Sequence, residues 1–327
     1  MVFANQASLL CQLLDLKGRL RSAVSSDGPS EDLRRLLQEV DLALGRLTEG
    51  THGLCEMCAD PIELNRPEAE PLIRTCLAQL SLCEQRMLEH DLDLAHQVQK
   101  SLLPANDLQV DGWETAYHYA AAGPVSGDYC DLIKPEQDRE RFYFFLGDVS
   151  GKGIAASILM SHLQGIFRTV RRAQARVSLL VERANRLLFE GSPSMCFATL
   201  VGGRADRSGE VEICNAGHCQ PLIVRKGNVE MVPVTDRPIG LFCDVRFRTH
   251  KLKLESGDIL VCYSDGWTEA RNKQDGLYGP QRLVKLVKRH ERLSAADLTR
   301  VCLEDLKRFS SGAPMADDVT LLVLKKN

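Results

Sequence analysis

The sequence predicts an α+β protein: an α-β-β-α sandwich of two antiparallel sheets flanked by helices, preceded by a small α-helical domain and a linker helix. Two observations carry this prediction. Leucines recur at helical spacing within residues 1–103, which indicates amphipathic helices. From Trp113 onward, strand-like runs alternate with pairs of helices, an order typical of two packed sheets with helices on their outer faces.

The composition narrows the class of protein. The 327 residues exceed the usual size of one domain, and 44% of them are hydrophobic, as in an ordinary globular core. The net charge of −3 argues against a surface that binds nucleic acid or membrane. Residues 1–103 carry 10 Lys and Arg against 16 Asp and Glu, while residues 104–327 carry 31 against 28, so the second part is better suited to an anionic substrate.

Cysteine usage and hydropathy indicate the compartment. The 12 cysteines are scattered through strand-like and helix-like segments and do not form a disulfide framework. No apolar run approaches the roughly 20 residues that span a bilayer, and the first residues lack the pattern of a signal peptide. We therefore expect a cytoplasmic protein with no nucleic-acid partner and no membrane partner.

The first domain is expected to span residues 1–70. Leucines between residues 5 and 24 predict one helix, and Ser30 caps a second helix that ends near Leu47, so the two should form a hairpin. A CxxC motif, Cys55 and Cys58, follows the hairpin, and Cys76 comes after 17 further residues. This spacing is typical of a zinc ribbon.

The hairpin and the CxxC motif together resemble the DksA/TraR-type zinc finger over roughly residues 5–80. Gln79 replaces the fourth thiol of that family, so the site is short of one ligand. His52, Cys83 or water could complete it, and a metal-free fold held by packing is the alternative. If Cys76 and Cys83 shared one helix they would lie about 10 Å apart along its axis, too far for one zinc ion.

Residues 71–104 are expected to form a linker helix. An apolar seam runs along it from about Pro71 and ends where Pro104 stops the helix. The seam residues are Leu80, Met87, Leu88, Leu92, Ala95, Val98 and Leu102. The helix is either a rigid connector or a signalling helix that pairs with a second copy of the chain, which would make a homodimer.

Residues 105–327 are expected to form the third and largest domain. Its strands are predicted at residues 115–120, 129–134, 141–146, 196–202, 211–216, 220–225, 246–252, 258–263 and 318–324. Its helices are predicted at residues 154–173, 176–190, 280–290 and 294–308.

Four aspartates stand at strand ends or tight turns of this domain: Asp128, Asp148, Asp265 and Asp317. A hairpin that pairs the strands of Asp128 and Asp148 would bring both carboxylates to one edge of a sheet. Crowded carboxylates repel one another, and divalent ions relieve that repulsion. Oxygen ligands without nearby His or Cys favour Mg²⁺ or Mn²⁺, and two such ions can activate water for attack on phosphorus.

The motifs around these aspartates occur in a recognisable order. They are Ser-Gly-Asp-Tyr-x-Asp at 126–131, Gly-Asp-Val-Ser-Gly-Lys-Gly at 147–153, Asn-Ala-Gly-His at 215–218, Tyr-Ser-Asp-Gly at 263–266 and Asp-Asp-x-Thr-Leu at 317–321. The set resembles the metal-dependent PPM (phosphatase-2C-like) Ser/Thr phosphatases, and within them the bacterial SpoIIE/RsbU branch, over about residues 95–327.

This resemblance implies a two-metal phosphatase. Asp128 and Asp148 would bridge two Mn²⁺ or Mg²⁺ ions with the Val149 carbonyl as a further ligand, and Asp265 and Asp317 would complete the ligand set. The implied substrate is a phosphoserine or phosphothreonine on a STAS-domain anti-sigma-factor antagonist in a partner-switching pathway. The implied role of the N-terminal part is regulation.

Other residues of these motifs have weaker claims to chemistry. Ser150 has no base placed to activate it, and His218 is interpreted as a turn residue. Lys152 either attracts phosphate or lies in solvent, and Asp318 at most supports a neighbouring ligand.

Two other classes of protein are weighed against the phosphatase. A catalytically silent phosphatase-like scaffold would be expected to have lost one of the four aspartates. A transcription-associated adaptor that uses its finger module would need a basic surface, and residues 1–103 are acidic.

Overall fold

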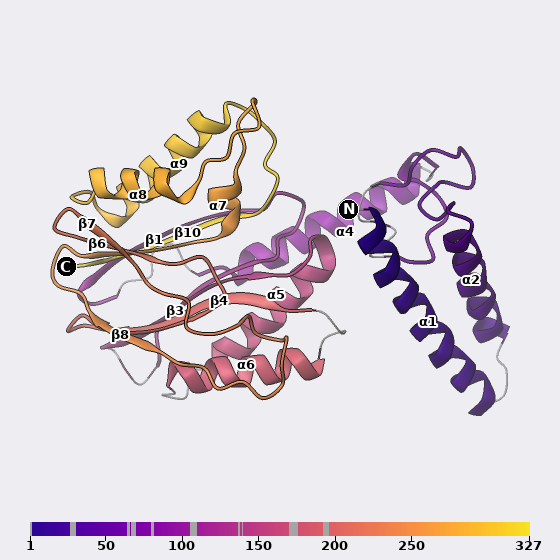
Figure 1. Cartoon of the computed structure of the whole chain (residues 1–327), viewed down its shortest axis with the longest axis horizontal. Helices are drawn as coiled ribbons and strands as arrows, with labels where there is room; N and C mark the ends of the chain where they lie inside the picture. Colours follow the sequence, from indigo (N-terminus) through magenta and orange to yellow (C-terminus); the bar gives the residue numbers. More distant parts are fainter. Residues whose placement is uncertain are drawn as a thin grey trace. The chain divides into compact units, whose positions relative to one another are not determined.

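The computed structural model describes residues 2–26, 31–63, 66, 70–79, 82–104, 110–136, 138, 140–169, 176–191 and 196–327. The chain divides into two compact units, Met1–Asp91 and Leu92–Asn327 (Figure 1). The three-part division at residues 70 and 104 therefore stays a proposal. None of the described helices has the length and hydropathy needed to cross a bilayer.

The larger unit contains two five-stranded sheets in which every pair of neighbouring strands is antiparallel. The first sheet has the order β1 (Trp113–Ala120), β10 (Val319–Lys326), β9 (Ile259–Tyr263), β6 (Leu222–Arg225) and β7 (Asn228–Met231). The second has the order β2 (Asp128–Ile133), β3 (Arg141–Val149), β4 (Ala198–Asp206), β5 (Glu210–Ala216) and β8 (His250–Lys253).

Helices cover the outer face of each sheet, which confirms the predicted α-β-β-α sandwich (Figure 1). Helices α5 (Gly153–Arg168) and α6 (Val177–Gly191) pack on the second sheet. Helices α8 (Pro280–Arg289) and α9 (Ala295–Ser310) pack on the first. A short helix, α7 (Asp265–Glu269), follows β9 directly.

The alternation along β3 shows why this strand is central. Phe142, Phe144 and Leu146 point into the core between the two sheets, whereas Tyr143 and Phe145 point into the core beneath α5 and α6. Successive side chains of a strand face opposite sides of the sheet, so a strand buried on both faces reads as a continuous apolar run.

Two glycines of β4 make room for the aromatic rings of β3. Gly203 pairs with Phe144 and Gly202 pairs with Phe145 in the strand register. A Cβ atom at Gly203 would lie 2.0 Å from the Phe144 ring, so only glycine fits opposite that ring.

In the larger unit, several predicted boundaries are wrong by a few residues, and β7 and α7 were not predicted. The segment predicted at 246–252 forms a strand only over His250–Lys253. Strand β7 was missed, although Lys226 and Gly227 have the two consecutive positive φ values of a tight hairpin turn. Helix α7 was missed because five residues are too few to show a helical period.

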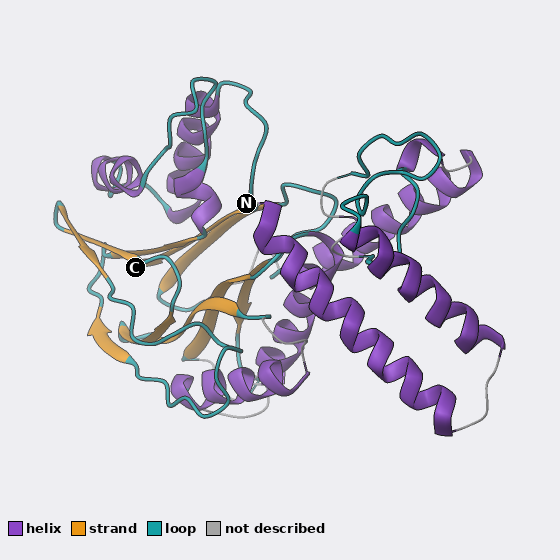
Figure 2. Cartoon of the chain, turned by 45° about the vertical axis from the view of Figure 1, so that its right-hand side comes forward, coloured by secondary structure: helices purple, strands orange, loops and turns teal. Residues whose placement is uncertain are grey.

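In the smaller unit, α1 (Val2–Ser26) and α2 (Glu31–Thr48) pack against each other (Figure 2). Their contact is a leucine-rich cluster centred on Leu13 and Val40, both fully buried. This confirms that the leucine stripes of the two predicted helices cover one another.

The predicted start of the linker helix near Pro71 is wrong. Helix α4 spans Leu82–Leu102, and the preceding residues 70–79 form turns and a short 3₁₀ helix, Leu77–Gln79. The backbone of this segment bonds to the cysteine turn and not within a helix: the Arg74 carbonyl accepts a hydrogen bond from the Glu56 amide at 2.8 Å. Cys76 therefore precedes α4 and does not share a helix with Cys83, so the separation of about 10 Å expected along one helix axis does not apply. The side chain of Cys83 lies outside the described residues.

Candidate active site

The pairing of β2 with β3 places two of the predicted aspartates together. Asp128 and Asp148 are direct partners in the antiparallel register, as the predicted hairpin requires. Asp128 is only 1% exposed, and its carboxylate accepts a hydrogen bond from the Thr320 hydroxyl. Because Thr320 belongs to β10, this bond joins the two sheets at the site.

The other two aspartates approach from the first sheet. Asp265 opens α7 after β9, and Asp317 lies two residues before β10, so both stand at the same end of a neighbouring strand pair. Gly266 lies in close contact with the segment that contains Asp317: a Cβ atom at Gly266 would lie 2.0 Å from the Asp318 carbonyl oxygen. Glycine at this position allows the two acidic segments to meet.

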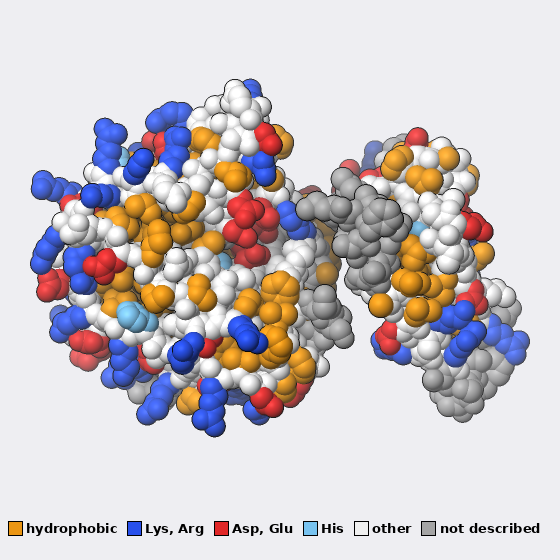
Figure 3. Space-filling view, in the orientation of Figure 1, with side chains coloured by type: hydrophobic (Ala, Val, Ile, Leu, Met, Phe, Trp, Pro, Cys, Tyr) orange, Lys and Arg blue, Asp and Glu red, His pale blue; other side chains and the backbone are white. Residues whose placement is uncertain are grey.

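The four carboxylates affect one another electrostatically. Burial, together with the negative charges of Asp265 and Asp317, raises the pKa of the Asp148 carboxyl to about 7. Burial also holds the pKa of Asp128 well above its usual value, and the charge of Asp148 adds to this effect. The pKa of Asp265 is raised by burial and by Asp317. Figure 3 shows a compact group of acidic side chains on this face of the larger unit.

The donor set fits hard divalent cations. It consists of carboxylates and includes no thiol or imidazole, which is the chemistry that Mg²⁺ and Mn²⁺ prefer. No three of these carboxylates have ligand oxygens that all lie within 4.8 Å of one another, a spacing that the described residues show only for the three thiols discussed below.

Both carboxylate oxygens of Asp318 accept backbone amides of the loop before Asp128. One carboxylate oxygen accepts the Ala122 amide at 2.7 Å, and the other accepts the Gly127 amide at 2.8 Å. Asp318 thereby fastens the loop that leads into Asp128. These hydrogen bonds agree with the expectation that Asp318 at most supports a neighbouring ligand.

Ser150 and His218 are structural. The Ser150 hydroxyl accepts a hydrogen bond from the Phe197 amide at 3.0 Å. Both ring nitrogens of His218 have partners, Thr199 Oγ1 at 2.7 Å and the Tyr263 carbonyl at 3.1 Å. Burial lowers the pKa of His218 to about 4, so the ring is neutral at pH 7. The interpretation of His218 as a satisfied turn residue is confirmed.

Lys152 is neither free in solvent nor remote from the site. Its Nζ lies 3.1 Å from Asp317 Oδ2 and donates to the Ala316 carbonyl at 2.8 Å. The lysine of the glycine-rich turn thus places a positive charge beside the acidic group.

Gln99 is a contact of the site that the sequence analysis did not identify. It lies on α4 and is 4% exposed. Its amide donates to the Ser126 carbonyl at 2.7 Å and accepts from the Ser126 amide at 2.9 Å. Ser126 Oγ in turn accepts the Asp128 amide at 3.0 Å. The end of α4 is thereby connected, through Ser126, to the backbone amide of Asp128.

The three predicted cysteines form a separate cluster in the smaller unit. The sulfur atoms of Cys55, Cys58 and Cys76 all lie within 4.8 Å of one another. The tight turn between the first two is closed by the Ala59 amide, which donates to the Cys55 carbonyl at 2.8 Å, with Ala59 at φ 58°. Burial raises the pKa of the Cys55 thiol, but backbone N–H groups outweigh burial and lower it to about 6.

Of the ligands left open for a fourth position, His52 has no ring nitrogen within 4.8 Å of all three sulfur atoms. Its Nε2 lies 3.0 Å from the Pro71 carbonyl. Gln79 lies in the 3₁₀ helix.

Comparison with known proteins agrees with this geometry. The model of the stage II sporulation protein E (SpoIIE) family matches residues 138–327. Phosphoserine phosphatase RsbU of Bacillus subtilis is 24% identical over 245 residues, which cover 74% of this chain and 72% of RsbU. The chain spans only 44% of a second relative, protein IcfG of Synechocystis, at 25% identity.

Solved structures share the fold. The SiaA-PP2C domain of Pseudomonas aeruginosa superposes with a TM-score of 0.66 at 16% identity and covers 76% of this chain and 100% of that domain. The RsbU and RsbW domains of Rv1364c from Mycobacterium tuberculosis superpose with a TM-score of 0.57 at 29% identity. That match covers 69% of this chain and 62% of the other.

The two packed sheets and the acidic group where their ends meet define a PP2C-type serine/threonine phosphatase domain. The chain belongs to the SpoIIE family.

The close approach at Gly266 generates a prediction. Gly266→Ala forces the Asp265 segment away from Asp318, and a misplacement of about 1 Å at an active site costs about 100-fold in rate. We expect a loss of that size in turnover of p-nitrophenyl phosphate, with the circular dichroism spectrum unchanged. Gly165→Ala is the matched control, because nothing lies within 4 Å of its added Cβ. Wild-type turnover in Gly266→Ala would contradict the tight fit.

Proposed function

We propose that this chain is a metal-dependent protein phosphatase that hydrolyses phosphoserine or phosphothreonine on a STAS-domain anti-sigma-factor antagonist. The observation that carries the proposal is the buried acidic group. Asp128 and Asp148 are paired across two strands and resist carrying both charges without a cation nearby.

Asp128, Asp148, Asp265, Asp317 and the Val149 carbonyl would hold two Mn²⁺ or Mg²⁺ ions. When bound, such ions would neutralise charge on the phosphoryl oxygens. They would also lower the pKa of water, so that hydroxide is available to attack phosphorus. The chain's own residues hold the ligands in place: Thr320 orients the Asp128 carboxylate, and Asp318 fastens the loop before it. Lys152, already beside Asp317, supplies a positive charge for the phosphate.

The substrate class rests on the relatives. RsbU is a phosphoserine phosphatase by name, and the Rv1364c structure contains an RsbU domain and an RsbW domain. These relatives support the expectation, which the motif resemblance implies, that the chain acts in partner-switching regulation on a phosphorylated STAS-domain protein. The smaller unit would then receive the activating signal in the cytoplasm, in a stress or developmental response.

Removal of a ligand charge tests the phosphatase site. Asp148→Asn or Asp265→Asn should lower phosphate release by more than about 100-fold, since even residues that only support metal ligands cost 10–100-fold. EDTA should abolish the wild-type activity, and Mn²⁺ or Mg²⁺ should restore it. Ser150→Ala is the control and should keep most of the activity, because its hydroxyl serves only the Phe197 amide. Activity of Asp148→Asn near the wild-type level, or rescue by zinc alone, would contradict the site.

The linker helix is proposed to pair with a second copy of the chain. Its apolar side chains Met87, Leu94 and Val98 are each more than half exposed, at 62%, 51% and 53%. A stripe of this kind gains free energy when a partner helix covers it. Because Gln99 of the same helix holds the Ser126 loop, pairing would reach the active site directly.

Val98→Glu tests this pairing. The charge should split a dimer into monomers and change the phosphatase rate, without disturbing the fold, because Val98 is exposed. Lys100→Glu, an exposed charge change on the same helix, is the control. Light scattering and phosphate release should be measured together. If Val98→Glu alters neither, the helix is only a tether.

The cysteine cluster is proposed to bind zinc weakly. Three sulfur atoms surround one position on a tight turn, while the family resemblance expects a fourth thiol where Gln79 stands. Its small core consists of Cys55, Ile62 and Cys76 with two partly buried neighbours, which is little to hold a loop-rich segment without a metal. An incomplete ligand set would leave the thiols reactive enough for redox sensing.

Metal analysis with Gln79→Cys decides whether the cluster is incomplete. The wild type should contain less than one zinc per chain and lose it readily to a chelator, and Gln79→Cys should raise both zinc content and thermal stability. Cys76→Ser should lose the metal, and Cys11→Ser, at an exposed thiol of α1, should not. One tightly held zinc in the wild type, unaffected by Gln79→Cys, would show that another residue fills the fourth position.

A further inference from the structure

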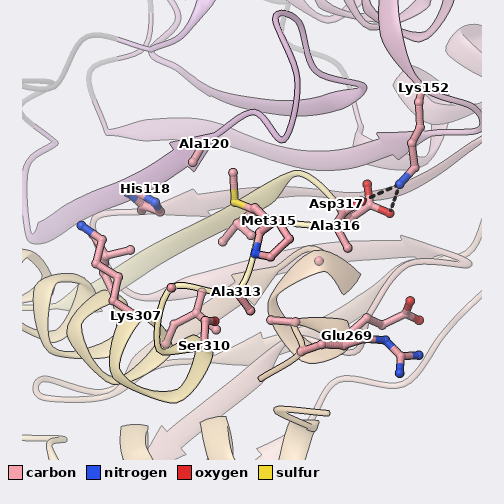
Figure 4. Close-up of a pocket in the computed structure, with 18 residues that line it drawn as sticks. His118, Ala120, Lys152, Glu269, Lys307, Ser310, Ala313, Met315, Ala316 and Asp317 are labelled. Carbon is pink, nitrogen blue, oxygen red and sulfur yellow. Dashed lines mark hydrogen bonds and ion pairs between the residues drawn. The ribbon is translucent and has the colours of Figure 1, made fainter. Parts of the chain in front are cut away.

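A cavity of about 710 Å³ adjoins the acidic group on the side of the first sheet. It lies between β1, α7, α9 and the loop that leads from α9 to β10 (Figure 4). Its walls are mostly apolar and include Leu303, Leu306, Ala313, Pro314 and Met315. A volume of this size with mostly apolar walls is typical of a ligand-binding pocket.

The cavity and the active site share a wall. Asp317 and Lys152, which belong to the acidic site, also line the cavity, and Figure 4 shows their ion pair at its rim. Gly266, the neighbour of Asp265, lines it as well. A phosphorylated side chain that reaches the carboxylates therefore brings its flanking residues to the mouth of the cavity.

The charges around the cavity favour an anionic chain. Lys152, Arg271 and Lys307 line it together with two acids, Glu269 and Asp317. Once Asp317 serves a cation, as proposed above, the remaining charge is positive. Phosphorylated segments are negative, so the rim and the substrate are complementary.

His118 contributes no charge to the cavity. It packs edge-on against Trp267 with ring centroids 6.3 Å apart. Burial lowers its pKa, and Lys307 lowers it further in the same direction. A neutral imidazole at this wall leaves the interior suited to an apolar group.

We propose that this cavity receives an apolar side chain located within a few residues of the phosphoserine or phosphothreonine of the protein substrate. The proposal rests on the phosphatase function and adds a determinant of substrate choice. Consecutive residues of an extended segment are about 3.3 Å apart, so a side chain two or three positions away reaches the cavity while the phosphate lies at the carboxylates. Met315 in the wall can adapt to side chains of different shape.

Filling the cavity tests the proposal. Ala313→Trp should raise KM for a phosphorylated STAS protein by about tenfold or more, because the added indole would occupy the space in which the substrate's apolar side chain is buried. Turnover of p-nitrophenyl phosphate, which has no flanking residues, should stay within about twofold of the wild type, an energy difference well below 1.4 kcal/mol. Lys307→Glu should also raise KM for the phosphoprotein, because it reverses a positive charge that lines the cavity, and it should leave turnover of p-nitrophenyl phosphate unchanged. Met231→Trp, on exposed β7, is the control for an added indole. It should change neither the KM for the phosphoprotein nor the turnover of p-nitrophenyl phosphate.

Three outcomes would overturn the proposal. An unchanged KM for the phosphoprotein in Ala313→Trp would show that the cavity takes no part in substrate binding. Equal losses with both substrates would show that the cavity only shapes the active site. A small molecule released on denaturation of the wild type, but not of Ala313→Trp, would make the cavity a small-molecule site. Failure of the phosphatase function itself is distinguishable, because the wild type would then hydrolyse neither substrate.

Discussion

Repulsion between Asp128 and Asp148 is the constraint on which the catalytic end of this molecule depends. The two carboxylates are partners across β2 and β3, in surroundings dry enough to raise the pKa of both. Such an arrangement costs folding free energy when both carboxylates are ionised, and either protonation or a bound cation relieves that cost. The neighbouring groups reduce the cost in part: the Thr320 hydroxyl donates to Asp128, and Lys152 brings a positive charge to Asp317.

The site also depends on how closely two backbones approach. The first sheet contributes Asp265 and Asp317, the second contributes Asp128 and Asp148, and the ends of the sheets must meet for the four to converge. Gly266 allows contact with the Asp318 backbone, and the Asp318 carboxylate then fastens the loop before Asp128. Local changes in that loop, including any transmitted through Gln99, would therefore act on a buried carboxylate directly.

Local sequence patterns predicted the two-sheet fold and the four aspartates of the acidic group, but they did not reveal contacts between residues that are distant in the sequence. The aromatic run of β3 and the Gly-Asp motifs indicated the strand ends and the acidic group. A strand buried on both faces and a glycine turn can each be recognised from residues that are adjacent in the sequence. Thr320 and Asp128 are 192 residues apart, and Gln99 and Ser126 are 27 apart, so no spacing rule could pair them. The start of α4 was misplaced because residues 70–79 form tertiary contacts with the cysteine turn that override their helical pattern.

Manganese-soaked crystals of the chain would show whether the four carboxylates hold metal ions. Anomalous scattering at the manganese edge locates the ions without reference to activity or substrate. We expect two peaks among Asp128, Asp148, Asp265 and Asp317, and their loss in Asp148→Asn crystals. Well-diffracting wild-type crystals with no manganese peak among these carboxylates, at saturating Mn²⁺, would contradict this expectation.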